Sequence, residues 1–228
     1  MKELTSIILT CKIRSLVQSQ MTMTVIDMIN KFTNRDEYEL IVVDPEPAFP
    51  IRDDYKTFPK YTHLMLSPDP DYASCMNLGA KEAKGKYLVF IQNDVFVQER
   101  WLPGLRQYLE SGKFDVVFPN QFPKDRAYVL ERQNLSPFDP LCMKEVRDAG
   151  LIMMTREIFD KTGGWGEGMS LLAEQDMYQK LDKVGCRQLA TSKVYIAHIM
   201  AGTNFMQLHT DKVGYDKRMD KDAKRMNG

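Results

Sequence analysis

The polar residues with the clearest chemical potential follow a short apolar run near the middle of the chain. Residues 87–91 read YLVFI and lead directly into Gln92, Asn93 and Asp94. A carboxylate at the tip of a buried strand, with a polar partner two residues away, can bind a divalent cation that also holds phosphate oxygens. The pair Asn-Asp is also common turn chemistry. Taken alone, the triplet is explained more simply by a turn than by a metal site.

Two other apolar runs end in groups that can bind ligands. The run YELIVVD ends in Asp44, and a carboxylate at a strand end can accept hydrogen bonds from a nucleotide base or ribose. The run KVYIA is followed by His198, which can serve as a metal ligand or a phosphate contact. Each residue also has a simpler structural explanation: a cap that introduces Pro45 for the acid, and a structural strand-end contact for the histidine.

A glycine-rich segment precedes a helix that carries two more carboxylates. Residues 163–176 read GGWGEGMSLLAEQD and include Trp165, which we expect to be exposed, together with Glu174 and Asp176. Two residues apart on a helix, the carboxylates point to different faces, so one of them can face a cleft and act as a general base toward a hydroxyl. On their own, they are explained more simply as an acidic helix surface.

The apolar pattern around these residues alternates between strand and helix signals. Strands are predicted at 5–10, 38–44, 62–66, 87–91, 114–118 and 149–154, with short ones near 187–191 and 193–197. Helices are predicted at 17–32, 74–84, 99–111, 155–161 and 170–184. The proline-rich segments 45–60 and 119–148 predict irregular connections, and the charged tail 211–228 predicts a frayed terminus.

This alternation predicts an α/β domain with a mostly parallel central sheet, flanked by helices and built with right-handed crossovers. Ligands of such sheets bind beyond the carboxyl ends of the strands. Thr10, Asp44 and the triplet 92–94 stand at such ends, which makes them candidate site residues.

Composition and missing motifs exclude several classes of function. The 228 residues carry 31 basic and 31 acidic side chains, so no overall positive charge drives binding to nucleic acids or anionic membranes. No apolar run approaches the roughly 20 residues of a membrane span, and we expect no signal peptide. The four cysteines form no CxxC pair, which favours free thiols and a cytoplasmic location. GxSxG, Walker-type and GxGxxG motifs are absent.

Taken in order, the segments resemble the GT-A glycosyltransferases, especially the family 2 group, over residues 4 to 205. TSIILTCKI and YELIVVD resemble the first two strands of that family. NLGAKEAKGKYLVFIQNDVFV is similar to its helix, strand and DxD segment, and is the most specific match. AGLIMMTREIFDKTGGWGEGM resembles the acceptor-side segment, AEQDMYQKL the catalytic helix, and VYIAHIMAGTNF the late strand with a histidine near the leaving diphosphate.

The resemblance implies a role for each matching residue. Asp94 and His198 would be metal ligands. Glu174 would be the catalytic carboxylate, and Asp176 would take that place if the alignment shifts by two residues. The donor nucleotide would be contacted by Thr10, Asp44, Asn77, Gln92 and Asn93. The acceptor side would be lined by Gly164 and Trp165.

Three positions depart from the family pattern. Gln92 replaces the first acid of the DxD motif, which removes one negative charge and should weaken a divalent cation site. Met76 replaces an arginine before the asparagine of the NxG segment, which removes one expected donor contact. The catalytic pair reads Ala173-Glu174, so the acid has a longer arm than the usual aspartate.

The implied reaction is the transfer of a sugar from a nucleoside diphosphate to an acceptor hydroxyl, of the hexosyltransferase type and with inversion at the anomeric carbon. Mn²⁺ or Mg²⁺ would neutralise charge on the leaving diphosphate. The expected donor is a UDP-sugar, and the acceptor hydroxyl is on a glycan, lipid, protein or nucleic-acid base.

The single domain would divide into a nucleotide-sugar half over 1–98, an acceptor half over 99–210 and the charged tail 211–228. Two alternatives stay open. One is a degenerate module that binds nucleotide sugars without turnover. The other is a sugar-phosphate nucleotidyltransferase, although the glycine-rich loop that such enzymes carry after the first strand reads TCKIRSLVQ here.

Overall fold

A sheet of eight strands forms the centre of the computed structural model, which describes residues 3–45, 61–66, 71–122, 147, 150–199 and 212–227. The strands are β1 (Thr5–Thr10), β2 (Tyr38–Pro45), β3 (Tyr61–Leu66), β4 (Tyr87–Gln92), β5 (Val95–Phe96), β6 (Val116–Phe122), β7 (Leu151–Thr155) and β8 (Gln188–His198). The helices are α1 (Leu16–Phe32), α2 (Tyr72–Glu82), α3 (Trp101–Glu110), α6 (Arg156–Thr162), α7 (Ala173–Lys183) and α9 (Lys212–Asn227).

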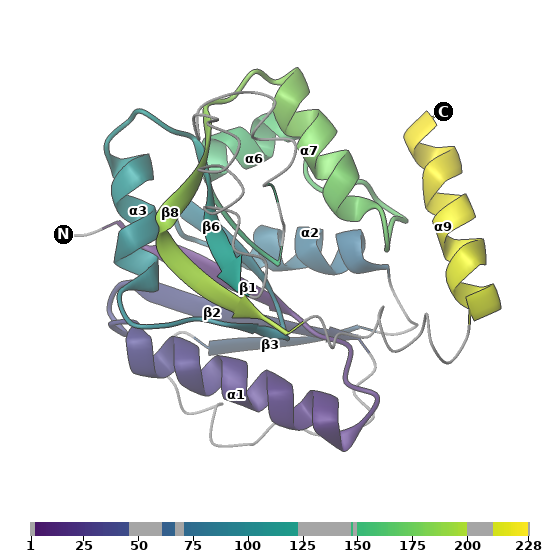
Figure 1. The fold of residues 1–228 in the computed structure, drawn as a ribbon, viewed down its shortest axis with the longest axis horizontal. Coiled ribbons are helices and arrows are strands. Elements are labelled where there is room, and N and C mark those ends of the chain that lie inside the picture. The colour runs from purple at the N-terminus through teal and green to yellow at the C-terminus, as the bar shows by residue number, and fades with distance from the viewer. Residues whose placement is uncertain are drawn as a thin grey trace.

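The strand order is β3-β2-β1-β4-β7-β6-β8-β5. Figure 1 labels β1, β2, β3, β6 and β8 of this sheet. From β3 through β4, neighbouring strands pair in parallel, as the sequence predicts. Strand β7 is antiparallel to β4 and β6, whereas β6 and β8 pair in parallel and β5 is antiparallel to β8. The predicted α/β fold with a mostly parallel sheet is confirmed. Because β1, β2 and β4 run in one direction, their carboxyl ends lie at the same side of the sheet.

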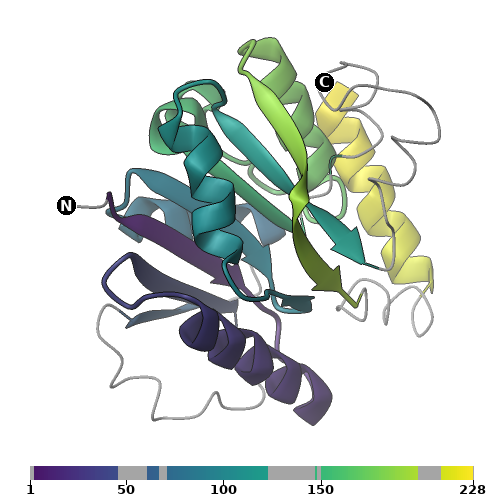
Figure 2. The same cartoon turned by 60° about the vertical axis from the view of Figure 1, so that its left-hand side comes forward.

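Helices cover both faces of the sheet because its central strands are apolar on both sides. Ile8 and Phe90 point to one face and pack with residues of α2, α6 and α7. Ile7, Leu9 and Ile91 point to the other face and pack with α1 and α3. Figure 2 shows α1 and α3 on the near side of the sheet and α2 behind it. The strands are thus fixed from both sides, and their polar ends are held rigidly.

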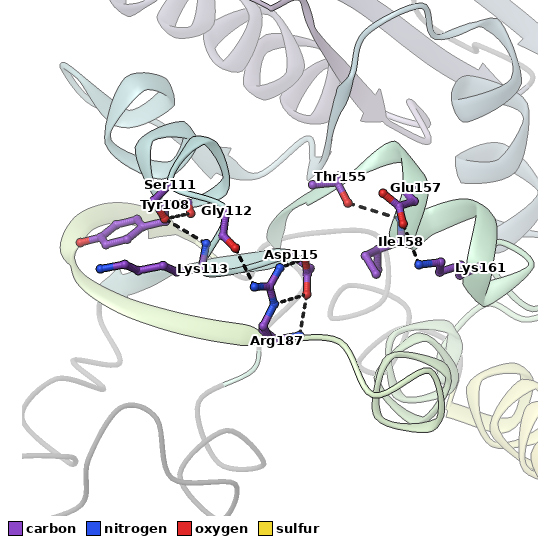
Figure 3. Close-up of polar contacts among 10 residues, drawn as sticks. All are labelled: Tyr108, Ser111, Gly112, Lys113, Asp115, Thr155, Glu157, Ile158, Lys161 and Arg187. Carbon is purple, nitrogen blue, oxygen red and sulfur yellow. Dashed lines mark hydrogen bonds and ion pairs between the residues drawn. The ribbon is translucent and has the colours of Figure 1, made fainter.

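An ion pair joins the segments that precede β6 and β8 (Figure 3). Two nitrogens of the Arg187 guanidinium contact the two Asp115 carboxylate oxygens at 2.6 and 2.9 Å, and Nη1 donates to the Gly112 carbonyl at 2.6 Å. The hydrogen bonds from Arg187 hold the pKa of Asp115 below its ordinary value. This pair lies directly before the first register position of the parallel strands β6 and β8, where Val116 is opposite Gln188.

Three predicted segments differ from the structure. One strand, β8, replaces the two short strands: it stays extended through exposed Ser192 and Lys193, where its register with β6 shifts between Pro119 and Asn120. Strand β6 continues to residue 122, into the segment predicted as irregular. The prediction that the tail 211–228 is frayed is wrong, since helix α9 occupies residues 212–227. Its Asp222 is buried and its Met226 packs against the core, so tertiary contacts order it.

The rest of the segments predicted as irregular, 46–60 and 123–146, lies outside the described residues, as does Cys142.

Candidate active site

The carboxyl ends of β1, β2 and β4 bring the predicted strand-end residues together. Thr10 is in register with Gln92 on β4 and with Val43 on β2, one residue before Asp44. Thr10 and Asp44 are buried, whereas Gln92 is half-buried. The three polar side chains therefore lie on adjacent strands at one end of the sheet, as the parallel topology requires.

The late helix α7 reaches the same place. Nε2 of Gln92 donates a 2.6 Å hydrogen bond to Oε1 of Glu174, although the two residues are 82 positions apart. Glu174 belongs to the first turn of α7, where the helix dipole favours a negative charge. The tip of the central strand and an acid of the late helix are thus in direct contact.

Tyr72 is a member of this cluster that sequence reasoning missed. It is the first residue of α2, and its hydroxyl lies 3.5 Å from Nε2 of Gln92. Burial raises the pKa of the Tyr72 hydroxyl well above its ordinary value, and the charge of Glu174 raises it further. Contacts with Gln92 and Thr10 oppose this rise in pKa. The hydroxyl therefore stays protonated at neutral pH. The proline-rich residues before Tyr72 have no hydrophobic periodicity from which its position could be predicted, so the position is known only from the fold.

Asp94 and His198 form a second pair beside the first. Nε2 of His198 lies 3.4 Å from Oδ1 of Asp94, and the side chains are 11% and 3% exposed. The backbone sets this geometry, because Val95 is in register with His198 and the N–H of Ile199 donates to the Asp94 carbonyl at 3.1 Å. A glycine is needed close by: a Cβ on Gly150 would lie 2.7 Å from Nδ1 of His198.

Asp44 is fully buried at the end of β2. Burial raises the pKa of its carboxyl to about 6, while the Ile13 backbone N–H, the Arg14 charge and the Cys11 side chain lower it. The group is therefore ionised at neutral pH but close to its titration range. An ionised carboxylate at this position can accept hydrogen bonds from ligand hydroxyls.

The glycine-rich turn is held by α2 and α7. The side chain of Asn77 makes two hydrogen bonds with the Trp165 backbone: Nδ2 donates to the carbonyl at 2.9 Å and Oδ1 accepts from the N–H at 2.8 Å. Nζ of Lys180 donates to the Gly164 carbonyl at 2.9 Å and pairs with Asp176 at 2.9 Å. Asn77 and Asp176 thus stabilise the turn, while Glu174 faces Gln92.

Trp165 does not have the exposure that its sequence context predicts. The side chain is 1% exposed and packs edge-on against Tyr72 and Phe90, with ring centroids 5.9 and 5.3 Å away. The expectation of an exposed aromatic is wrong, because the turn folds inward onto the core. Its indole supports Tyr72 from beneath the cluster.

Asn93 also points away from the Gln92–Glu174 contact. Its Nδ2 donates to the Thr22 hydroxyl on α1 at 3.0 Å, and both side chains are buried. Successive strand-end residues thus alternate: Gln92 meets α7, Asn93 meets α1, and Asp94 meets β8.

The pair Asp94–His198 fits a divalent cation that is shared with a ligand. Oδ1 of Asp94 is buried and accepts no hydrogen bond from the described part of the chain. A carboxylate oxygen and an imidazole nitrogen suit Mn²⁺, and Mg²⁺ sites commonly combine one or two carboxylates with substrate phosphates. Among the described residues, no group of three or more His, Cys, Asp or Glu side chains could hold a metal ion. Phosphate and water would therefore supply the remaining ligands.

The strand order and the acidic groups at its carboxyl edge define the class of the protein as a GT-A glycosyltransferase domain. The sequence profile of the family described as "Glycosyl transferase family 2" matches residues 6–161, more than half of the chain. The chain belongs to this family. The predicted family is confirmed.

Two solved structures share the fold. The mannosyltransferase PcManGT from Pyrobaculum calidifontis, in complex with GDP-Man and Mn²⁺, has a TM-score of 0.73 and 16% sequence identity, over 92% of this chain and 61% of that chain. TarS 1–349 of S. aureus has a TM-score of 0.66 and 14% identity, over 86% of this chain and 60% of that chain. The chain thus spans about three fifths of each. No curated protein matches the sequence significantly.

In the described ranges, no helix is long and apolar enough to cross a membrane.

Proposed function

We propose that the protein transfers a sugar from a nucleoside diphosphate to an acceptor hydroxyl, with Glu174 as the general base. The observation that carries this proposal is the 2.6 Å hydrogen bond from Gln92 to Glu174, which holds the acid beside the strand ends where donors bind in sheets of this kind. Membership of glycosyl transferase family 2 supports the same reaction.

Glu174 takes the proton from the attacking hydroxyl as the new glycosidic bond forms. A positioned base of this kind contributes about 10²–10⁴-fold to the rate. Gln92 keeps the carboxylate oriented, and the Tyr72 hydroxyl lies beside the same Gln92 amide nitrogen. The sugar passes through an oxocarbenium-like state, and attack from the side opposite the leaving group inverts the anomeric carbon.

On the donor side, Thr10 and Asp44 contact the nucleotide, and Asp94 with His198 would hold Mn²⁺ or Mg²⁺. The cation supplies Lewis-acid stabilisation of the leaving diphosphate when it is bound. The complex of PcManGT with GDP-Man and Mn²⁺ supports a nucleotide-sugar donor with a divalent cation. We propose a UDP-sugar first and GDP-mannose second.

On the acceptor side, residues 99–210 provide the binding half and residues 1–98 the donor half. Gly164 and Trp165 belong to the glycine-rich turn that Asn77 holds, and this turn shapes the boundary between the two halves. Asn77 and Asn93 act on the donor site indirectly, through their hydrogen bonds to Trp165 and Thr22. The acceptor hydroxyl is on a glycan, lipid, protein or nucleic-acid base. Cys11 and Cys186 form no disulfide among the described residues, which favours the cytoplasm.

The proposal is tested by release of nucleoside diphosphate from UDP-glucose, UDP-N-acetylglucosamine and GDP-mannose, with Mn²⁺ and without an added acceptor, because active transferases slowly hydrolyse their donors. We expect hydrolysis of one donor that EDTA abolishes. Asp94→Ala should abolish it too, whereas Asp160→Ala, an exposed acid on α6, should leave it unchanged.

A donor that raises the melting temperature without being hydrolysed would contradict the enzymatic proposal and support a binding module, since ligand binding alone raises apparent stability.

A further inference from the structure

A buried carboxylate of the C-terminal helix α9 holds the backbone where α7 begins. Asp222 is 1% exposed, and its Oδ2 accepts hydrogen bonds from the backbone N–H groups of Ser170, Leu171 and Leu172 at 2.8, 2.6 and 3.0 Å. Three donors thus converge on one anionic oxygen, and such charge-assisted bonds are stronger than neutral ones. Figure 1 and Figure 2 both show α9 alongside α7.

Helix α7 lacks the local cap that other helices of this chain have. Ser15, Asp71 and Thr155 cap α1, α2 and α6 with their own side chains. Leu172 stands at the corresponding position of α7, and the described residues next to it provide no side-chain cap. The first N–H groups of a helix need acceptors, and an anion near them is favoured by the helix dipole. Asp222, 50 residues further along the chain than Leu172, places its carboxylate just before this helix end, on the N–H groups of the three residues that precede α7.

A second residue of α9 binds the same segment before α7, residues 167–172. Arg225 follows Asp222 by three residues, so both lie on one face of α9. Its Nη1 donates to the Glu167 carbonyl at 2.7 Å. A Cβ on Gly168, where φ is +79°, would lie 1.1 Å from this nitrogen, so the guanidinium packs where only glycine leaves room. Residues 167–172 are therefore held at both ends by α9.

Residues 167–172 lead directly into the candidate active site. Glu174 follows Leu172 by two residues and meets Gln92 at 2.6 Å. On its inner side, the segment is also tied to α2, because the Ala73 N–H donates to the Met169 carbonyl at 3.1 Å. The place where α7 begins thus sets the place of Glu174.

We propose that Asp222 is a positioning residue: by holding the N–H groups of residues 170–172, it fixes the first turn of α7 and with it Glu174 against Gln92. The catalytic part of this inference rests on the function proposed for Glu174. Its structural part does not depend on that function, and the two are tested separately.

The structural part is tested by hydrogen–deuterium exchange of the full-length chain without ligand. In Asp222→Asn and Asp222→Ala, we expect the amides of residues 170–176 to exchange at least tenfold faster, while those of β1 and β4 keep their protection. Asp220→Asn removes the same charge from an exposed position of the same helix and should leave exchange unchanged. Unchanged exchange over 170–176 in both Asp222 variants would overturn the proposal. If Asp222→Ala also loses protection in β4, the nearly isosteric Asp222→Asn decides.

The catalytic part is tested by steady-state hydrolysis of the donor that the wild-type chain turns over. We expect kcat of Asp222→Asn to fall about tenfold while KM for the donor changes less than twofold, because the donor site at the strand ends is untouched. A raised KM at unchanged kcat, or faster exchange with unchanged kcat, would overturn the positioning role. If the wild-type chain hydrolyses no donor, the proposed function fails, while the exchange experiment still decides whether Asp222 fixes Glu174.

Discussion

Gln92 places a hydrogen-bond donor where the DxD motif has an acid. Its Nε2 lies 2.6 Å from Oε1 of Glu174. A carboxylate at the same position would face another carboxylate, and two such groups in one site raise the pKa of one of them strongly. The neutral amide instead donates a hydrogen bond to Glu174 and orients its carboxyl group. It also leaves one negative charge fewer beside Asp94, so the cation of the proposed function would rely more on the diphosphate.

The isosteric variant Gln92→Glu tests this balance at neutral pH. The introduced carboxylate removes the donor and shares a proton with Glu174, so we expect kcat at pH 7 to fall about 10–100-fold, within the range that a general base contributes. The pH dependence of kcat should move to higher pH, because the pair loses its last proton later. A pH–rate profile equal to that of the wild type would show that Gln92 does not set the state of Glu174.

Asp44 predicts a pH dependence of donor binding. Its raised pKa of about 6 means that the carboxylate is ionised above pH 6 and protonated below it. A protonated Asp44 accepts ligand hydroxyl groups poorly, so the donor Kd should rise by up to tenfold per pH unit as the pH falls below 6.

Calorimetric titration of the wild type and Asp44→Asn with the same donor between pH 5 and 8 measures this effect. The variant should bind weakly at every pH and lose most of the dependence. An identical slope in both proteins would assign the titration to another group.

At the scale of elements, β5, β8 and the residue before β7 come together around Asp94 and His198, the two residues proposed to hold the cation. Gly150, just before β7, leaves room for the His198 ring, and β5 aligns Val95 with that histidine. The ring is thus placed by backbone elements that are not themselves polar. Supporting residues of this kind commonly change metal affinity by about 10–100-fold.

Gly150→Ala should therefore weaken Mn²⁺ binding about tenfold, because a Cβ would lie 2.7 Å from Nδ1 and 2.9 Å from Cε1 of His198. Mn²⁺ affinity can be followed by electron paramagnetic resonance in the presence of a nucleoside diphosphate. Adding Gly150→Ala to His198→Ala should have no further effect on affinity. A further loss in the double variant would mean that the glycine acts by another route.

The elements themselves were predictable wherever a single period dominates. The buried strands β1, β2 and β4 and the helix α1 have strong patterns, and the structure confirms them. Helix α9 was not predictable, because few of its residues are apolar and its order comes from Asp222 and Arg225 contacts with a distant segment. Strand β8 was also not predictable as one element, because exposed Ser192 and Lys193 break its apolar pattern at the point where its register with β6 shifts.

At the scale of the whole molecule, three distant parts of the chain build one site. The strand ends provide Thr10, Asp44 and Gln92, the late helix provides Glu174, and the C-terminal helix holds that late helix in place. The strand-end residues follow from parallel topology alone, and Glu174 follows from the family resemblance. The position of Tyr72 and the contacts of α9 with residues 167–172 depend on tertiary packing, so they could not be predicted from residue spacing.

The choice between Glu174 and Asp176 depends on this whole arrangement. Asp176 is paired with Lys180 at 2.9 Å, and Lys180 also holds the Gly164 carbonyl, so this acid stabilises the glycine-rich turn. Glu174 is the acid of α7 that meets the strand end. Under the proposed function, the two acids therefore have separate tasks: Glu174 acts in the chemistry and Asp176 in the scaffold.

The most direct test compares Glu174→Gln with Asp176→Asn in donor turnover at saturating donor and Mn²⁺. We predict that Glu174→Gln retains donor affinity within about threefold and loses kcat by about 10² or more, as expected for removal of a general base. Asp176→Asn should lose less than about tenfold and should instead lower the melting temperature. If Asp176→Asn loses kcat by two orders of magnitude while Glu174→Gln stays active, the central claim that Glu174 is the base is contradicted.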